Sequence, residues 1–453
     1  MTLKQTEVGV VPSHWEIIDF RDVCTESAFR PRFSGDLYTL DGNVATLRTT
    51  DLDDWGRISY STMPLARLDE EKFKKHFLNR GDLVITRSGT CGRTAIFEGF
   101  HIPVLHGAFS IRFRLSPQAD NLFFRYYFNS TGRPRILDLT TGSVQPNLTS
   151  TALLNLKIPL PPLNEQKEIA EIINTLDRKI ENLRKQNETL EKIAQILFKH
   201  WFVDFEFPFD PTAGSGQRFA QGKPSTDGKP YKSSGGAMVP SELGEIPAGW
   251  RVVRMEEIAN RIAMGPFGSR ITTDNFFDSG VPVVKGGNLV NGFNEGNFVY
   301  LTEEKADDLK SSNVFPEDIV FTHRGTLGQV GFIPTHSQYP RYVVSQSQML
   351  LSVNKTLASP RLIYRFFRSK LGLNAILANK NTTGVPSIGR PTTTLKSIQM
   401  ALPEATLMRQ FDTLIQATDF KKEANTKQIE TLTKTRDALL PKLMSGKLRV
   451  GGN

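Results

Sequence analysis

The chain has 453 residues, which predicts two to four domains at roughly 100 to 200 residues per domain and excludes a single small module. Apolar residues make up 39% and charged residues 23% of it, and no apolar run approaches the roughly 18 residues of a membrane-spanning helix. The formal net charge of +9 is compatible with a polyanionic partner without demanding one.

The cysteines and the first residues of the chain indicate its cellular compartment. The two cysteines, Cys24 and Cys91, form no CxxC pair, and the chain starts without a charged-then-apolar leader. We therefore expect a cytoplasmic protein without a disulfide or zinc framework and without a membrane association.

The chain repeats itself once, with a period of about 240 residues. Trp15 in VPSHWEIIDF matches Trp250 in IPAGWRVVRM, and Pro146 in TTGSVQPNL matches Pro386 in NTTGVPSI. DLVITRSGTCGR at 82–93 and DIVFTHRGTLGQ at 318–329 share six of twelve residues. Because this period is too long for a solenoid, it predicts a duplicated two-part unit with pseudo-twofold symmetry.

In chain order, the pattern predicts two similar α+β globular domains, each followed by a long helix. DLVIT and DIVFT indicate short strands before Gly-Thr-x-Gly turns, and LFFRYYF and RLIYRFF indicate short amphipathic helices. The predicted boundaries are a first globular domain at 1–160, a central helix at 161–203, a Gly/Pro/Ser-rich linker at 204–242, a second globular domain at 243–403, and a distal helix and tail at 404–453.

Apolar residues of the central helix follow a heptad seam. From Ile169 to Leu197 they recur at alternating spacings of four and three, with Asn187 as the polar exception. The distal helix keeps the same seam with polar interruptions at Thr418, Lys422, Asn425 and Arg436. If the helices pair antiparallel, Asn187 should lie near Lys422 and Asn425 and fix the register. The alternative is that each helix packs only on its own globular domain.

Positive charge is unevenly distributed along the chain. Residues 319–403 contain no Asp or Glu and ten Lys or Arg. Such asymmetry is typical of a phosphate-binding surface, and an ordinary solvated basic face is the alternative.

Motifs of enzyme chemistry are absent from the sequence. It contains no HExxH, GxSxG or Walker-type loop, its seven histidines are scattered, and the strings of an adenine methyltransferase do not occur. A metal nuclease with loosely spaced carboxylates stays open, although the most basic segment has no carboxylate to hold a metal. We therefore expect a chain that is catalytically silent by itself.

The order of the motifs resembles the specificity subunit of type I restriction-modification enzymes. The resemblance covers essentially the whole chain and rests on the xPxxW opening, on IPLPPLNEQKEIAEIINTLDRKIENL, on the GEIPAGW restart and on the closing TRDALLPKLMSGKLRV. The most specific parts are residues 159–183 and 435–450. The chain departs from the pattern with LPEATLMRQ where its first copy has LPPLNEQ.

The resemblance implies two target recognition domains, held apart by paired antiparallel helices, that each read one half of a split double-stranded DNA sequence. It also implies two methylation subunits that carry S-adenosylmethionine, and a restriction subunit that translocates DNA with ATP and Mg. No cofactor is expected in this chain itself.

Candidate base-reading side chains are those that differ between the matched segments. Arg87 and Ser88 become His323 and Arg324, and Arg93 becomes Gln329; arginine suits guanine and glutamine suits adenine. A phosphate contact or a plain surface position is an equal alternative for each. Strand spacing should place Gln346 and Gln348 on one face, and Arg112 and Arg114 on another. The full set of DNA-contact candidates is Arg87, Ser88, Arg93, Arg112, Arg114, His323, Arg324, Gln329, Arg341, Gln346, Gln348, Arg361, Arg365 and Arg368.

Two rival functions remain open at this point. One is a DNA-modifying enzyme whose site contains no recognisable motif. The other is a basic two-domain scaffold that binds RNA or an acidic protein without DNA specificity.

Overall fold

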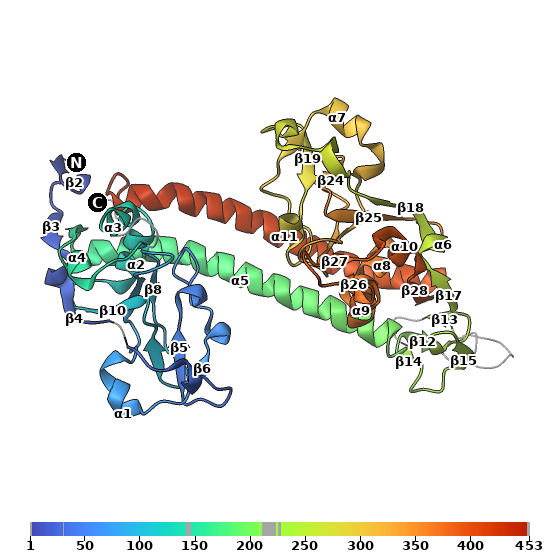
Figure 1. Ribbon diagram of the computed structural model, residues 1–453, viewed down its shortest axis with the longest axis horizontal. Helices are drawn as coiled ribbons and strands as arrows, with labels where there is room; N and C mark the ends of the chain where they lie inside the picture. Colours follow the sequence, from blue (N-terminus) through green and yellow to red (C-terminus); the bar gives the residue numbers. More distant parts are fainter. Residues whose placement is uncertain (1, 30, 142–145, 211–222, 225–227, 451–453) are drawn as a thin grey trace. The chain divides into compact units, whose positions relative to one another are not determined.

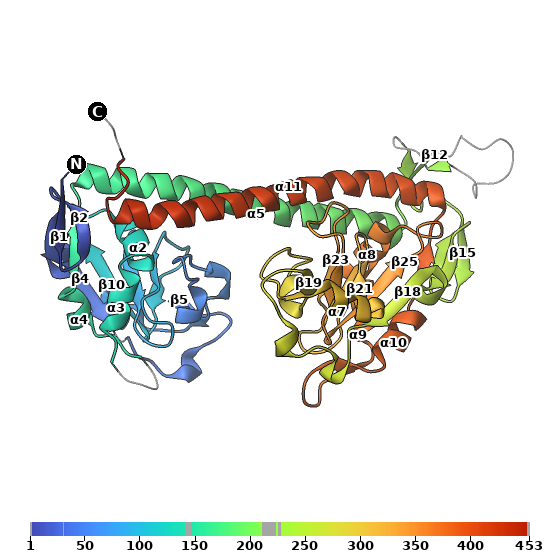
Figure 2. The same ribbon diagram turned by 90° about the horizontal axis from the view of Figure 1, so that it is seen from above.

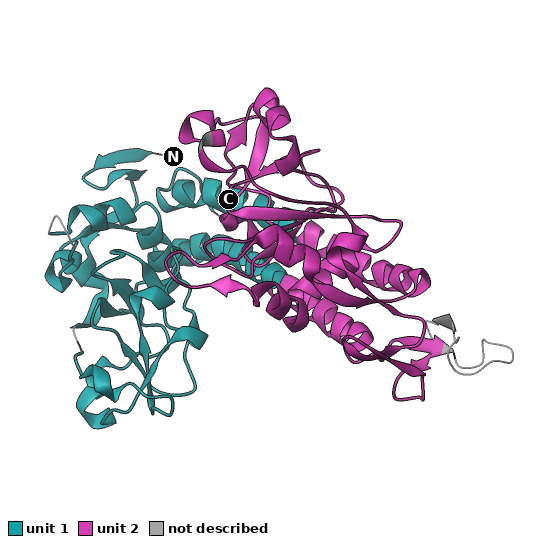
Figure 3. Cartoon of the chain, turned by 45° about the vertical axis from the view of Figure 1, so that its right-hand side comes forward, with its two compact units in different colours: residues 1–184, 426–453 teal, residues 185–425 magenta. Residues whose placement is uncertain are grey.

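The computed structural model describes residues 2–29, 31–141, 146–210, 223–224 and 228–450, and Figure 1 labels its helices and strands. The chain forms two compact units: unit 1 contains residues 1–184 and 426–453, and unit 2 contains residues 185–425 (Figure 3). Both units mix helices with sheets, which confirms the expected α+β class.

Unit 1 is built on two sheets. The larger is antiparallel, in the order β4 (Cys24–Phe29), β10 (Ser110–Leu115), β7 (Leu83–Thr86) and β8 (Thr94–Ile96). All four residues of β7 are buried, as the continuous apolar run LVIT predicts. The smaller sheet has the order β6 (Leu65–Ala66), β5 (Val44–Leu47) and β9 (Val104–His106), with β5 and β9 parallel. The remaining strands pair as β1 (Leu3–Thr6) with β2 (Gly9–Pro12), and β3 (Glu16–Asp19) with β11 (Lys157–Leu160).

The short helices of unit 1 are α1 (Glu70–Phe73), α2 (Asn121–Asn129), α3 (Arg133–Asp138) and α4 (Ser150–Leu154). α2 and α4 contact strands of the larger sheet, whereas Phe73 of α1 is buried with Val44 and Leu105 of the smaller sheet. The Asp120 side chain caps α2 by accepting a hydrogen bond from the Phe123 backbone N–H at 2.8 Å. Phe123, Phe124 and Phe128 then bury their rings in one cluster with Trp15.

Unit 2 repeats this arrangement. Its larger sheets have the orders β18 (Ala259–Met264), β25 (Gln348–Val353), β22 (Ile319–Thr322), β23 (Val330–Phe332), and β20 (Tyr300–Leu301), β19 (Val281–Val284), β24 (Tyr342–Val344), β21 (Asn313–Val314). β19 and β24 are parallel, as β5 and β9 are in unit 1. Smaller pairs are β15 (Met238–Ser241) with β16 (Gly244–Pro247), β17 (Arg251–Arg254) with β28 (Gln399–Leu402), and β26 (Lys380–Asn381) with β27 (Ser387–Ile388). The short helices are α6 (Met255–Ile258), α7 (Glu303–Asp308), α8 (Pro360–Arg368), α9 (Lys370–Leu377) and α10 (Pro391–Ser397).

Two helices of 40 residues each complete the fold: α5 (Leu163–Phe202) and α11 (Ala405–Met444). In unit 1, Ile169 and Ile173 of α5 share a buried cluster with Leu440 and Leu443 of α11 and with phenylalanines of α2. Figure 2 shows the ribbons of α5, α11 and α2. In unit 2, the Asn425 side-chain amide donates a hydrogen bond to the Asn187 carbonyl oxygen at 2.9 Å. The expected contact between Asn187 and Asn425 is therefore confirmed, whereas Lys422 pairs with Glu191 at 2.5 Å.

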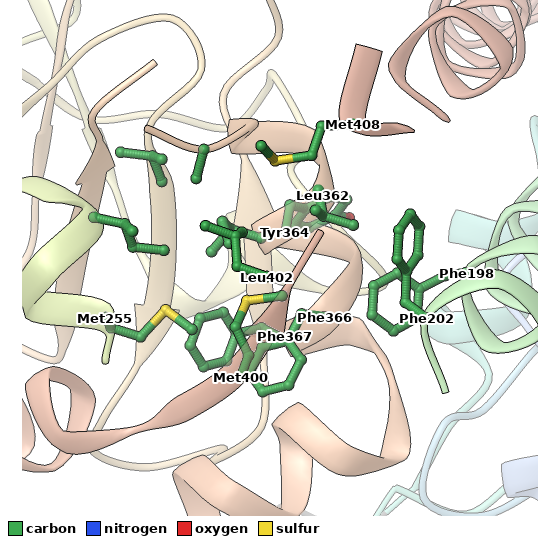
Figure 4. Packing of buried hydrophobic residues seen from close by; sticks show 14 of the residues in the cluster. Phe198, Phe202, Met255, Leu362, Tyr364, Phe366, Phe367, Met400, Leu402 and Met408 are labelled. Carbon is green, nitrogen blue, oxygen red and sulfur yellow. The ribbon is translucent and has the colours of Figure 1, made fainter. Parts of the chain in front are cut away.

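The core of unit 2 joins α5, α8 and α11. Phe198 and Phe202 of α5 contact Phe411 of α11, and they lie in one buried cluster with Leu362 and Phe366 of α8 (Figure 4). Each helix therefore packs against its partner helix as well as against a globular region. This differs from the alternative in which each helix packs only on its own globular domain.

The segment expected to be a linker, 204–242, lies partly outside the described residues, at 211–222 and 225–227. Its described parts contain the sheet β13 (Lys223–Pro224), β12 (Pro208–Asp210) and β14 (Lys229–Pro230). Phe207, Phe209 and Tyr231 are buried, and the rings of Phe207 and Tyr231 stack with centroids 4.5 Å apart. The described flanks of this segment are thus packed onto unit 2, because their aromatic residues belong to its core.

Candidate nucleic-acid interface

Three loops meet at one end of the larger sheet in unit 1. We name them the Gly-Thr turn (87–93), the tip turn (107–110) and the proline loop (146–148). The Arg87 backbone N–H donates to the Phe109 carbonyl at 2.8 Å, and the Leu148 N–H donates to the Arg87 carbonyl at 2.9 Å. The Arg87 side chain also donates through Nε to the Leu148 carbonyl at 3.1 Å. Arg87 therefore ties all three loops together.

The same three loops meet in unit 2, at 323–329, 345–348 and 386–388. The His323 N–H donates to the Ser347 carbonyl at 3.0 Å, and the Ile388 N–H donates to the His323 carbonyl at 2.9 Å. Arg324 forms a β-bridge with Ser387, as Ser88 does with Asn147 in unit 1. The internal repeat thus preserves the backbone contacts at this end of the sheet.

Glycines shape the Gly-Thr turns. Gly89 and Gly92 in unit 1 and Gly325 and Gly328 in unit 2 all have positive φ, between 73° and 94°. L side chains rarely adopt such values. The two glycines shared by the repeats are therefore needed for the turn itself.

The predicted residues at the three-loop end differ in exposure. Arg324 and Gln346 are exposed, and Gln329 is half-buried with its Oε1 accepting a hydrogen bond from Thr322 at 2.9 Å. Arg87, Ser88 and His323 are buried, and the guanidinium of Arg93 pairs with Asp54 at 2.9 Å. Arg324 and Gln346 are thus the predicted residues that are most open to a ligand here.

One expectation about this end is wrong. Gln346 and Gln348 do not share a strand face, because residues 346–347 form a turn and β25 begins only at Gln348. Gln348 is 1% exposed, and its Nε2 lies 3.4 Å from Thr322 Oγ1. Only Gln346 of the two faces solvent.

Arg112 and Arg114 lie on one face of β10, as their spacing predicts, but that face is covered. Both guanidinium groups pair with Glu26, and Arg114 also pairs with Asp82 at 3.0 Å. Arg112 is 0% exposed. Arg112 therefore lies in the interior and not at the DNA contact that we expected, because a guanidinium enclosed in this way does not reach a duplex.

The arginines of the acid-free segment are also engaged. Arg341 pairs with Glu303 and with Asp307, the latter at 2.6 Å. Arg361, Arg365 and Arg368 of α8 pair with carboxylates of other elements: Arg361 with Glu317 at 3.2 Å, Arg365 with Asp419 and with Glu191 at 2.8 Å, and Arg368 with Glu191 at 3.5 Å. All of these carboxylates lie outside the segment 319–403 in the sequence. Ion pairs within unit 2 therefore engage these arginines, and their contact with phosphate stays a prediction.

Other exposed groups at the three-loop end were not among the predicted residues. In unit 2 they include Lys380 and Arg390, which flank the proline loop, and in unit 1 they include Phe109 of the tip turn. The signal in the sequence was the matched pair TTGSVQPNL and NTTGVPSI, which marks the proline loop as part of the repeat. Sequence alone does not show that this loop lies beside the Gly-Thr turn.

A histidine lies buried at the base of the tip turn in unit 1. Burial, together with the nearby charges of His76 and Arg112, lowers the pKa of His106 to about 3. The matched position of unit 2 is Val344, because β9 and β24 occupy the same place in the repeat.

Lowering the pH should therefore destabilise unit 1 through His106. Below its ordinary pKa of about 6.5 this group takes up a proton in the unfolded chain but not in the folded one, so stability falls as the pH drops from about 6.5 towards 3. His106→Val should weaken this dependence, measured by denaturant unfolding across that range. His101→Val, which changes an exposed histidine, is the control. An unchanged pH slope in His106→Val would contradict this assignment.

The described part of the chain contains no group of three or more His, Cys, Asp or Glu side chains that could hold a metal ion. Within the same residues, no helix combines the length and apolar character that crossing a membrane requires.

The chain is similar to known proteins over nearly its whole length. Residues 12–192 match the family described as the type I restriction modification DNA specificity domain. The chain is 25% identical to the MjaIX type I restriction enzyme specificity subunit of Methanocaldococcus jannaschii, over 99% of this chain and 96% of the relative. It is 22% identical to the HindI specificity subunit of Haemophilus influenzae, over 67% and 71%.

A solved structure shares the fold. The S subunit of the type I restriction-modification system from M. genitalium aligns over 100% of both chains with a TM-score of 0.56 and 16% identity. Residues 12–192 thus contain a type I restriction modification DNA specificity domain, and nearly the whole chain is similar to a specificity subunit of a type I restriction enzyme.

Proposed function

We propose that each three-loop end reads one half of a split double-stranded DNA target. The observation that carries this proposal is the repeated set of backbone hydrogen bonds that joins the same three loops in both units while the side chains differ. Phosphate contacts position a protein on DNA, whereas base contacts specify the sequence. A preserved backbone with different side chains supports recognition of two different half-sites.

Exposed cations support contact with a duplex. Arg324, Lys380 and Arg390 are exposed around the loops of unit 2, and Arg48 is 46% exposed beside the tip turn of unit 1. Among the predicted residues, we retain Arg324, Gln329 and Gln346 as candidates for base contacts in unit 2, and Arg93 in unit 1.

The domain assignment follows from this proposal. Residues 1–160 and 243–403 are the two target recognition domains, 161–203 and 404–453 supply the helical spacer, and 204–242 connects the first spacer helix to the second domain. Partner subunits supply the chemistry: two methylation subunits bind S-adenosylmethionine and methylate adenine, and restriction subunits use ATP and Mg to translocate and cut DNA.

Mapping of methylated adenines tests the function. In a host that carries the partner subunits, the complete system should methylate one bipartite sequence, and deletion of this gene should abolish that methylation. The purified chain alone should transfer no methyl group from S-adenosylmethionine. Methyl transfer by the isolated chain would establish the enzyme alternative, and binding to RNA or an acidic protein with no preference for any duplex would establish the scaffold alternative.

The long helices should act as a ruler for the unspecified bases between the half-sites. Inserting four residues between Leu183 and Leu190 lengthens α5 by about 6 Å and rotates the downstream part by only about 40° beyond a full turn, so the apolar seam is nearly preserved. Since one base pair rises about 3.4 Å, we expect the spacer of the methylated sequence to lengthen by one or two base pairs.

The control for this insertion is the methylated sequence of the unaltered chain in the same host. Both half-site sequences should be unchanged in the variant. Altered half-site bases with an unchanged spacer length would show that the helices do not set the distance.

A further inference from the structure

The tip turns have the same backbone but opposite chemistry at their exposed ends. In unit 1 the Gly107 N–H donates to the Leu47 carbonyl at 2.9 Å, and the Ser110 N–H donates back to Gly107 at 3.0 Å. In unit 2 the Ser345 N–H donates to the Val284 carbonyl at 2.9 Å, and the Gln348 N–H donates back to Ser345 at 3.0 Å.

Both tip turns are also joined to the Gly-Thr turn. The Phe109 carbonyl accepts from the Arg87 N–H at 2.8 Å, and the Ser347 carbonyl accepts from the His323 N–H at 3.0 Å. Three backbone hydrogen bonds therefore hold each turn in the same way. A side chain on such a turn has a fixed origin, which is what reading a base edge requires.

The side chains at the two tips differ completely. Unit 1 presents Ala108 and Phe109, and unit 2 presents Gln346 and Ser347 at the matched positions. Phe109 is 57% exposed and is the most exposed aromatic side chain among the described residues of unit 1. A single exposed apolar residue is ordinary; its place on a turn that the repeat preserves is what distinguishes this one.

A cation stands beside each tip turn. Arg48 follows Leu47 and Lys285 follows Val284, the two residues whose carbonyls hold the turns. Arg48 is 46% exposed and its guanidinium pairs with the buried Asp51 at 2.9 Å, while Lys285 lies 4.8 Å from the ring centroid of Phe276. Positive charge next to an exposed base-reading side chain suits a duplex, whose phosphates flank the groove.

We propose that the tip turns determine specificity, with Phe109 contacting a thymine methyl group in one half-site and Gln346 hydrogen-bonding a purine edge in the other. The inference rests on the proposed function. Apolar side chains recognise the thymine methyl group, and the glutamine amide matches the donor and acceptor of adenine. The two half-sites should therefore differ at the base pair that faces the tip turn.

An exchange of the tips within the complete system tests this inference. The double variant Ala108→Gln, Phe109→Ser gives unit 1 the tip of unit 2, and Gln346→Ala, Ser347→Phe makes the reverse change. We expect the first variant to lose preference for one A·T pair in one half-site by about tenfold or more, with the other half-site unchanged. The reverse variant should change the other half-site only.

The matched control is Leu3→Ala, which removes a side chain of similar exposure from β1 and should leave both half-sites intact. Unchanged half-sites in both exchange variants, or uniform loss of methylation without altered base preference, would overturn the inference. Should the exchange lower the melting temperature, Phe109→Leu replaces it: retained thymine preference is then expected, and its loss overturns the inference. Absence of any bipartite methylated sequence with the unaltered chain would instead refute the proposed function.

Discussion

Replacement of Asp177 by alanine should lower the free energy of unfolding of unit 1 by about 3–5 kcal/mol, because it breaks a buried ion pair from one side. The Asp177 carboxylate lies 2.9 Å from Arg436 of α11 and 3.4 Å from Arg125 of α2, and it accepts a hydrogen bond from the Tyr126 hydroxyl at 3.0 Å. Its side chain is 7% exposed. Removing it would leave two enclosed arginines without their shared partner.

Hydrogen exchange of peptides from 163–184 and 426–444, together with denaturant unfolding, measures this loss. Asp437→Ala is the matched control, because Asp437 also pairs with Arg436, at 2.7 Å, but is 45% exposed; a solvent-exposed pair contributes only about 0–1 kcal/mol. Equal effects of the two variants would refute a special role for the buried carboxylate.

Arg365→Ala should destabilise unit 2 by a comparable amount, about 3–5 kcal/mol. Arg365 is 2% exposed and joins α8 to both long helices through Glu191 of α5 and Asp419 of α11. Although burial alone would raise the pKa of Glu191, the neighbouring Arg365 and Lys422 hold it below its ordinary value. Without Arg365, Glu191 and Asp419 would lose the most buried of their cationic partners, although Lys422, Arg368 and Arg361 would stay beside them.

Arg365→Ala also distinguishes the packing role of Arg365 from the phosphate contact that the sequence predicts. Arg341→Ala is the control, because Arg341 pairs with carboxylates that are 71% and 61% exposed, where about 0–1 kcal/mol is expected. If Arg365→Ala unfolds normally yet flattens the salt dependence of DNA binding, Arg365 contacts phosphate. Reduced stability with an unchanged salt slope in the remaining folded protein supports the packing role.

The long helices were predictable from sequence because their packing is periodic. A heptad seam placed Ile169, Ile173 and Asn187 on one face, and antiparallel pairing then brought Asn187 to Asn425. Arg436 looked like an interruption of the seam in the distal helix. It is tolerated there because Asp177 lies opposite, and its guanidinium carbon also lies 3.9 Å from the ring centroid of Trp55.

The placement of charge was not predictable by counting along the chain. Residues 319–403 carry no carboxylate, yet Glu191 and Glu303 reach their arginines across sequence separations of 174 and 38 residues. Folding thus pairs part of this segment, namely Arg341, Lys355, Arg361, Arg365 and Arg368, with carboxylates from other parts of the chain. The convergence of the three loops was hidden for the same reason, since Arg87 and Leu148 are 61 residues apart.

The composition of unit 1 has a consequence for protein synthesis. Arg436 and Asp177 are separated by 259 residues, and Leu440, Leu443 and Met444 belong to the same buried cluster as Trp15. At roughly 5–20 residues per second, a ribosome needs some tens of seconds after making Asp177 before it makes these partners. Unit 2, which is continuous from 185 to 425, is complete first. Unit 1 must therefore wait for residues 426–444, and a nascent chain released before them would carry a complete unit 2 and a unit 1 with an open core.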